Sequence, residues 1–399
     1  MNKNFGYCKE CKEKNTGLKW CRSCNAKRLE AEFSSWTSSN EELDKFLRET
    51  QLTARCWQEV FEWIPYTNIT EVEEVGRGGY GIIYKSKWKK GCIIKWMPKE
   101  KKWARWGTEL VALKCLYEGF SDFMHELKIL HQYMKFNPNG FECYGVTQDP
   151  HTHKYFIVTD YYRKGDLRHY FRCHARNLNW SKKLDMLLQL ARDLRNIHNA
   201  DLVHKDLHSG NVLVDTITCI SDLGQSQDVR TLQTSTEVNG VMPYVAPEVL
   251  CIRPYTKAAD IYSFGMIMWE FTSFQLPFSE RPHDIDLAFS ICDGLRPKPI
   301  EGTPPCYIEL MQQCWNSDPK KRPTAEYIAN TLQGWFEGSN ENISNQFKTA
   351  DEFNSVNPVR ENSQSVHKSA IYTSRLLPTI PIVNNYSTRQ FDFILPDEN

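Results

Sequence analysis

Residues 204–211 constrain the fold of this chain more than any other stretch. Asp206 and Asn211 stand five residues apart in this stretch, and the apolar run at 212–214 follows directly. A polar loop fixed between apolar runs places a carboxylate and an amide side by side. The carboxylate can accept a hydroxyl proton, and the amide oxygen can help to hold a metal ion. This pair alone is only a candidate site, so the motifs around it decide what the loop does.

The composition limits the class of protein. The 399 residues suffice for one large two-lobed domain or for two to three smaller ones, and 49 Lys and Arg balance 49 Asp and Glu. This balance argues against a dedicated nucleic-acid-binding protein and against a polybasic membrane anchor. No apolar run approaches the roughly 20 residues of a membrane span, and the N-terminus lacks the apolar core of a secretion signal. We therefore expect a cytoplasmic protein, with the nucleus as a further location.

Four of the 14 cysteines lie in the first 24 residues, at Cys8, Cys11, Cys21 and Cys24. Two Cys-x-x-Cys pairs supply the four thiolates that a structural zinc site prefers. Four free thiols or two disulfides are the alternatives, but the other cysteines are scattered singly, which suits a reducing compartment. We predict a zinc-ribbon-like module over residues 1–32. The module is basic, yet we expect it to bind a protein or cap the fold and not to bind nucleic acid.

Residues 33–66 read as a helical connector. Ser38, Ser39 and Asn40 precede two glutamates, as at a helix start. Leu43 and Leu47 then fall on one helical face. We expect this connector to pack on the next domain.

A glycine pattern, Gly-x-Gly-x-x-Gly, follows with Gly76, Gly78 and Gly81. Such glycines let the backbone approach phosphates closely, but dinucleotide-binding folds share the pattern. Here the glycines lead into a strand-like run at 82–86 rather than a helix. That order favours a lid over phosphates and disfavours a dinucleotide-binding turn.

Two lysines compete for the next position in the series, a lysine in a buried strand. Lys95 has the more usual distance from the glycines, whereas Lys114 has the better context, Val-Ala-Leu-Lys. Glu126 lies on a predicted helix downstream, while Glu109, the rival partner for Lys95, does not. We choose Lys114 with Glu126, which makes residues 87–109 an inserted hairpin and a candidate partner surface.

Further motifs follow in order along the chain. An apolar stripe at helical spacing spans residues 184–197, just before the loop at 204–211. Asp222 stands in an Asp-Leu-Gly triplet, and the polar segment after it holds four hydroxyl residues. Ala-Pro-Glu ends this segment at Glu248, for which Arg322 is a candidate partner. The four hydroxyl residues are Thr231, Thr234, Ser235 and Thr236.

This ordered set resembles the eukaryotic protein kinases over residues 69–335, and several segments resemble the tyrosine-kinase-like group of mostly Ser/Thr kinases. The resemblance implies an α+β, bilobal fold, with a small antiparallel-sheet lobe plus one helix over a large helical lobe. The kinase domain would span residues 67–337, with the N-lobe at 67–159 and the C-lobe at 163–337. The tail, 338–399, is poor in apolar residues and is expected to be largely disordered, with an apolar island at 370–377.

The resemblance also implies ATP- and Mg²⁺-dependent transfer of a phosphoryl group to protein hydroxyls. Asp206 would accept the hydroxyl proton, Asn211 and Asp222 would hold Mg²⁺, and Lys114, held by Glu126, would anchor phosphates. The nucleotide contacts would come from Val75, Gly76, Gly78, Gly81, Ile83, Ala112, Lys114, Thr159, Asp160, Tyr162 and Leu213. Asp160 and Tyr162 lie in the lobe hinge, whose backbone would grip the adenine. The partners would be protein substrates, besides any protein that binds the zinc module, the 87–109 insertion or the tail.

Four residues depart from the usual kinase pattern. Lys205 replaces the Arg that pairs with a phosphorylated activation loop, and Lys lacks its bidentate fork. His208 replaces a Lys near the γ-phosphate, which predicts pH dependence between about 6 and 7. Leu223 replaces Phe, and Val241 follows Gly240 where Ser/Thr kinases place a Thr. The alternative function is a pseudokinase scaffold, although no key residue is lost.

Overall fold

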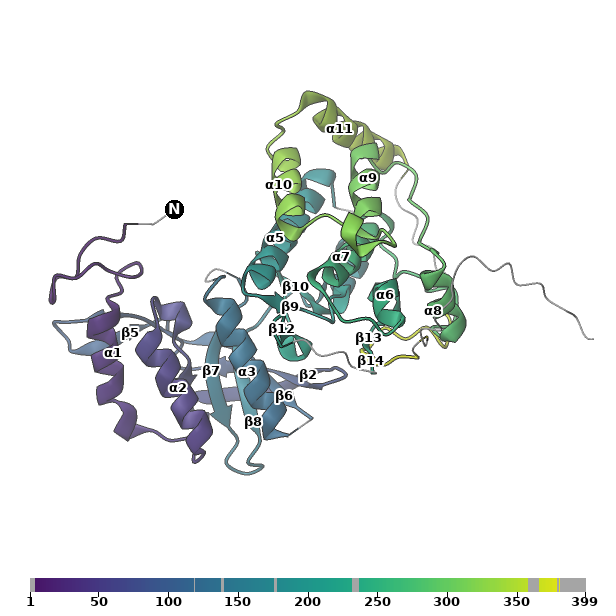
Figure 1. The fold of residues 1–399 in the computed structure, drawn as a ribbon. Coiled ribbons are helices and arrows are strands. Elements are labelled where there is room, and N and C mark those ends of the chain that lie inside the picture. Colours follow the sequence, from purple (N-terminus) through teal and green to yellow (C-terminus); the bar gives the residue numbers. More distant parts are fainter. Residues whose placement is uncertain are drawn as a thin grey trace, which may run out of the picture.

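We describe the protein from a computed structural model. The structure describes residues 4–117, 119–137, 140–175, 178–231, 237–357, 366–378 and 380. The chain forms a sheet-rich lobe and a larger helical lobe, with the N-terminal helices against the first (Figure 1). The bilobal fold predicted from the sequence is confirmed. Across the described ranges, no helix is both long and apolar enough to cross a membrane.

The N-lobe is built on a six-stranded sheet. Its strands pair antiparallel except for β1, which runs parallel to β7. One sheet face carries an apolar cluster around Trp88 and Leu113, and the other faces the cleft and α3 (Phe120–Met134). The strands are, in spatial order, β1 (Glu62–Trp63), β7 (Cys143–Gln148), β8 (Tyr155–Asp160), β6 (Glu109–Leu116), β3 (Gly81–Trp88) and β2 (Ile69–Arg77).

The segment expected to be a helical connector belongs to the N-lobe. Helix α2 (Glu41–Thr53) starts where predicted, because the Asn40 side chain accepts a hydrogen bond from the Leu43 N–H. Leu43 and Leu47 are buried in the main core. The residues of β1 follow and join the sheet, so the predicted boundary at 66/67 cuts through one packing unit.

The predicted insertion is a hairpin, β4 (Ile93–Met97) and β5 (Lys102–Arg105), paired apart from the main sheet. Its tryptophans pack on the N-terminal module of the same chain. Trp103 stacks on Trp20 at 5.8 Å between ring centroids and donates to Glu32 at 2.9 Å, and Arg28 lies over Trp96. This aromatic surface, which we expected to face a partner, holds the module against the lobe.

The C-lobe is a helical core around α5, whose predicted apolar stripe is buried throughout. Its helices are α4 (Leu167–His174), α5 (Trp180–Asn199), α6 (Pro247–Leu250), α7 (Lys257–Ser273), α8 (Ile285–Cys292), α9 (Pro305–Cys314), α10 (Ala325–Phe336) and α11 (Glu341–Val356). The described part of the lobe also holds three short strand pairs: β9 (Leu202–Val203) with β12 (Gln227–Asp228), β10 (Val212–Val214) with β11 (Thr218–Ile220), and β13 (Asn239–Gly240) with β14 (Arg375–Leu376).

The tail differs from the disordered segment that we expected. Residues 341–356 form α11, which buries Phe347 and Ala350 against the C-lobe. Residues 366–378 run along the C-lobe and end in β14, beside β13 (Figure 1). The scarcity of apolar residues predicted disorder, but Leu377 and Ile380 are buried. Residues 358–365, 379 and 381–399 lie outside the described part of the tail.

Candidate active site in the interlobe cleft

The strand register places four predicted site residues on one sheet face. Ile83 pairs with Lys114, and Ala112 pairs with Thr159. Residues opposite each other in antiparallel strands share a face, and so do residues two apart on one strand. Ile83, Ala112, Lys114 and Thr159 therefore face the cleft together, as a nucleotide pocket requires.

Asp160 and Tyr162 were predicted to contact the nucleotide through the backbone of the lobe hinge, and the direction of their side chains is compatible with that prediction. The carboxylate of Asp160 lies on the opposite sheet face and accepts a hydrogen bond from Tyr144 Oη. The Tyr162 ring is buried and stacks on Phe141 in the core. Only the backbone of these two residues can serve the pocket. Leu213, in β10, is half-buried, and its backbone pairs with that of Asp166 in an isolated antiparallel β-bridge.

Lys114 joins two carboxylates at the centre of the cleft. Its Nζ lies 2.6 Å from Glu126 Oε1 and 2.7 Å from Asp222 Oδ1, so strand β6, helix α3 and the Asp-Leu-Gly segment meet at one ammonium group. Burial raises the pKa of Asp222, but Lys114 outweighs this and holds it below the usual value. Despite burial, the two carboxylates raise the pKa of Lys114. Burial raises the pKa of Glu126, against the influence of Lys114.

The rival lysine lies outside this arrangement. Lys95 is in β4, in the hairpin that pairs apart from the main sheet. Glu109 begins β6 itself and lies beside Cys92, where burial raises its pKa to about 7. The structure therefore makes the Lys114–Glu126 pair and not the alternative.

The glycine loop lies over the cleft at the turn between β2 and β3. Gly78 N–H donates to the Gly81 carbonyl at 2.9 Å, which closes the turn. A Cβ on Gly81 would lie 2.4 Å from the Cys115 carbonyl oxygen, so this position excludes other residues. The space around Gly76 is open, and Val75 is exposed beside it.

A buried carboxylate on α7 holds the loop at 204–211. Asp260 accepts backbone hydrogen bonds from His204 at 2.9 Å and Lys205 at 3.1 Å, and it contacts His198 Nε2 at 2.9 Å. Lys205 takes a left-handed backbone with φ of 70°, which turns the chain toward Asp206. The Asn211 amide donates to the Asp206 carbonyl at 2.9 Å. Asp206 and Asn211 are therefore brought together as predicted.

The Asp206 carboxylate is buried and ionised. Burial raises its pKa, but His208 and the Ser374 hydroxyl together bring the pKa below the usual value. Ser374 Oγ donates to Asp206 Oδ2, while Oδ1 is buried and accepts no hydrogen bond among the described residues. An ionised carboxylate with one vacant oxygen is suited to accept a proton.

Arg168 on α4 is a site residue that the sequence did not reveal. Its guanidinium contacts His208 Nδ1 at 3.0 Å and donates to Ser209 Oγ at 3.1 Å. The Gly210 N–H also reaches His208 Nδ1, at 3.1 Å. Because both groups donate, Nδ1 must be the acceptor, and the ring is neutral with its proton on Nε2, 3.7 Å from Asp206 Oδ1. The position of Arg168 in the sequence does not indicate that its side chain contacts the loop at 204–211.

The burial of His208 corrects the expected pH window. Burial lowers the pKa of His208 from its usual 6.5, against the influence of Asp206. The two donors on Nδ1 oppose protonation further. The charge of His208 is therefore expected to change at a lower pH than that of an ordinary histidine.

The predicted contact between Glu248 and Arg322 in the large lobe is a buried, bidentate ion pair. Arg322 Nη1 and Nη2 each lie 2.7 Å from an oxygen of Glu248. Thr231 is exposed, whereas Thr234, Ser235 and Thr236 lie outside the described residues.

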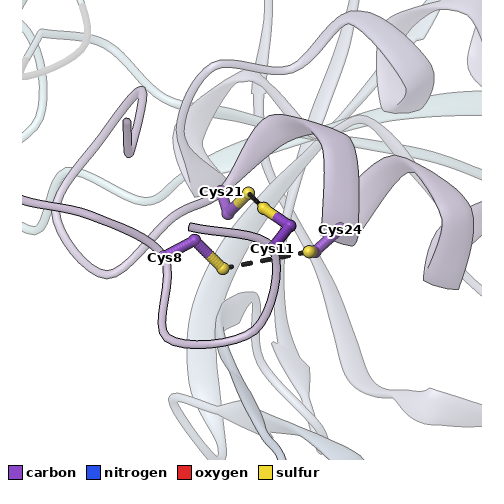
Figure 2. A group of neighbouring side chains, drawn as sticks. All are labelled: Cys8, Cys11, Cys21 and Cys24. Atoms are coloured by element: carbon purple, nitrogen blue, oxygen red, sulfur yellow. Dashed lines mark hydrogen bonds between the residues drawn. The ribbon is translucent and has the colours of Figure 1, made fainter. Parts of the chain in front are cut away.

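The four N-terminal cysteines converge on one point (Figure 2). The Sγ atoms of Cys8 and Cys24 are 3.8 Å apart, and those of Cys11 and Cys21 are 3.5 Å apart, too far for disulfides. Cys21 and Cys24 lie at the start of α1 (Arg22–Ala31), so the module combines short bridges with a helix.

The sequence of this chain also matches a known protein family. The family described as protein tyrosine and serine/threonine kinase matches residues 69–332. The chain belongs to this family. The predicted kinase resemblance is thereby confirmed, and protein substrates, ATP and Mg²⁺ are those of the family.

Several curated proteins are similar to this chain. "Probable serine/threonine-protein kinase drkD" of Dictyostelium discoideum is 29% identical over 285 residues, which cover 69% of this chain and 20% of that protein. A protein of Acanthamoeba polyphaga mimivirus, named as a serine/threonine-protein kinase/receptor, is 29% identical over 271 residues, covering 66% of this chain and 15% of that protein. The chain thus spans a fifth or less of these relatives' length.

Proposed function

We propose that this chain is an ATP- and Mg²⁺-dependent protein kinase that phosphorylates Ser and Thr residues in intracellular signalling. The observation that carries the proposal is Lys114 held by Glu126 and Asp222 beside the loop of Asp206 and Asn211. The Ser/Thr preference follows the names of the similar proteins. We place the chain in the tyrosine-kinase-like group from the segments quoted above, and in the cytoplasm or nucleus from its scattered cysteines.

The residues divide the work of phosphoryl transfer. Lys114 neutralises the non-transferred phosphates, and Glu126 orients it. Asp206 positions the acceptor hydroxyl and takes its proton into the carboxylate, whose Oδ1 is vacant. The glycine loop excludes water from above. Ile83, Ala112 and Leu213 give apolar contacts to the base, with Thr159 beside it.

Asn211 and Asp222 fit Mg²⁺ by their donor set, since this ion prefers carboxylate and amide oxygens. The Asn211 amide N–H is used by the Asp206 carbonyl, which leaves the amide oxygen for the metal. Bound there, Mg²⁺ would neutralise charge on the phosphates. Asn211 lies on the same loop as Asp206, which places a proposed metal ligand beside the proposed base.

The N-terminal module fits structural zinc. A Zn–S distance of about 2.3 Å requires sulfur atoms about 3.8 Å apart in a tetrahedral site, and the cysteine pairs are 3.8 and 3.5 Å apart. Trp20 anchors the module, since its Nε1 donates to the Ala54 carbonyl at 3.1 Å. We propose that zinc holds this module against α2 and the hairpin.

A peptide array with Ser-, Thr- and Tyr-containing peptides tests the proposed activity. We expect Mg²⁺-dependent labelling of Ser and Thr peptides by the parent, and none by Asp206→Asn. ATP binding without labelling by either protein would support a pseudokinase scaffold instead.

A further inference from the structure

The C-terminal tail of the chain reaches the cleft and contacts Asp206. Residues 366–378 reach it along the C-lobe, where His367 N–H donates to the Ser279 carbonyl at 2.8 Å and His283 N–H donates to the Ser369 carbonyl at 3.0 Å. The Tyr372 hydroxyl donates to the Pro277 carbonyl at 2.8 Å. These contacts fix the direction of the tail before it enters the site.

The tail then binds as a strand. Arg375 and Leu376 pair antiparallel with Gly240 and Asn239, in the segment that ends the polar loop after Asp222. Leu377 N–H donates to the Val238 carbonyl at 2.8 Å, and the Leu377 side chain is 5% exposed. Strand addition of this kind fixes an extended peptide through its backbone, while pockets select side chains.

Ser374, one residue before this strand, lies at the catalytic carboxylate. Its hydroxyl donates to Asp206 Oδ2, and its Oγ is 3.4 Å from His208 Nε2. Arg168 donates to the Tyr372 carbonyl at 2.7 Å, next to its contact with His208. A Cβ on Gly79 would lie 2.7 Å from the Ser374 carbonyl oxygen, so the glycine loop covers the residue from the other side.

We propose that Ser374 is the phosphoacceptor of an intramolecular transfer, a step that rests on the proposed kinase activity. Ser374 Oγ bonds to the γ-phosphorus of ATP, and the bond from that phosphorus to the β–γ bridging oxygen breaks. The electron pair leaves with ADP, and the hydroxyl proton passes to Asp206. A tail that only blocked the cleft would not need a hydroxyl on this carboxylate.

The product of this step destabilises its own binding. A phosphate on Ser374 carries up to two negative charges beside the Asp206 carboxylate. Like charges at this distance repel, so phosphorylation releases the strand and opens the cleft to other proteins. The same tail residues define a substrate class, with Tyr two residues before the acceptor and Leu three residues after it.

Thr373 offers a matched control. It is exposed, and the hydroxyl that donates to Asp206 belongs to Ser374. Thr373→Ala is expected to leave the reaction unchanged, whereas Ser374→Ala removes the acceptor. Leu377→Asp and, separately, Tyr372→Ala weaken the docking of the tail without changing the acceptor.

The test follows phosphatase-treated, full-length protein with Mg²⁺ and ATP, with sites mapped by mass spectrometry across a hundredfold range of protein concentration. We expect phosphate on Ser374, a first-order rate constant independent of concentration, and at least a tenfold lower rate in both docking variants. A rate proportional to concentration, or an unmodified Ser374, overturns the proposal. Casein in parallel assays of the parent and docking variants separates the two claims. Labelled casein with an unmodified Ser374 overturns the tail proposal alone, and labelling of neither overturns both.

Discussion

Lys114 on β6 and Glu126 on α3 form an ion pair, with 2.6 Å between Nζ and Oε1. The pair links the sheet to helix α3, and Asp222 extends it into the C-lobe at 2.7 Å. Both contacts lie within the cleft and not on the surface, where ion pairs contribute little. Because both contacts lie at the proposed phosphate site, we interpret them as parts of the active site and not mainly as stabilising contacts.

Lys114→Met should lower phosphoryl transfer by about two to three orders of magnitude, because it removes a buried positive charge from the phosphate site. Lys95→Met is the matched control, since Lys95 lies in the separate hairpin, and it should retain parental activity. Initial rates with a Ser/Thr peptide measure both. Equal losses in the two variants would contradict the assignment of Lys114.

Removal of the N-terminal metal should destabilise the N-lobe, because the module packs on α2 and the hairpin through Trp20 and Trp103. We expect about one zinc ion per chain. Chelation or Cys21→Ser should lower the melting temperature, whereas replacement of the exposed Cys173 should not. Elemental analysis with thermal melting checks this. A zinc-free parent whose melting is unaffected by chelator would indicate free thiols.

His208 should titrate below its ordinary value of 6.5, since burial lowers its pKa and Arg168 donates to its Nδ1. NMR of histidine-labelled protein, with His208→Gln to assign the signal, gives this pKa. Arg168→Met removes a positive charge and a donor, so the pKa should rise toward 6.5 in that variant. An unchanged pKa would show that Arg168 does not set the protonation of the ring.

His131 should make the fold sensitive to acid. It packs edge-on against Phe46 and Phe61, and burial lowers its pKa to about 4. The unfolded chain, with a pKa near 6.5, binds the proton first as pH falls. Stability contributed by the neutral ring is therefore present above pH 6.5 and is lost as pH falls toward 4, by about 2 kcal/mol at pH 5.

Urea unfolding of the parent and of His131→Phe at pH 7 and pH 5 measures this effect. The parent should lose about 2 kcal/mol more than the variant between the two pH values. Other histidines contribute equally to both proteins, so the difference isolates His131. Equal losses of unfolding free energy in the two proteins would show that His131 does not cause this difference between pH 7 and pH 5.

Local patterns predicted the parts of the structure that depend on local contacts. Asn40 predicted the start of α2, and the spacing of the glycines, Lys114, Glu126 and Asp206 predicted the site. The sequence did not indicate where the side chains of the hinge residues Asp160 and Tyr162 point, because that direction depends on strand register and packing. Contacts between residues far apart in sequence, such as Arg168 with Tyr372, left no pattern that a single sequence displays.

The docked tail shows most clearly that contacts between distant residues could not be predicted from the sequence. Its composition predicts disorder, since the apolar residues are few. Docking depends instead on a small number of contacts with an already folded lobe, including Leu377 in the core and the backbone pairing with Asn239. The sequence of the tail cannot show the surface that receives it.

The most direct test of the account compares ATP binding and phosphoryl transfer in the parent and in Asp206→Asn. If Asp206 is the base, the variant should bind Mg²⁺-ATP with unchanged affinity, while its turnover of a Ser/Thr peptide falls by about two to four orders of magnitude. Parental turnover in the variant would contradict the central claim, and so would a parent that binds ATP but transfers no phosphate.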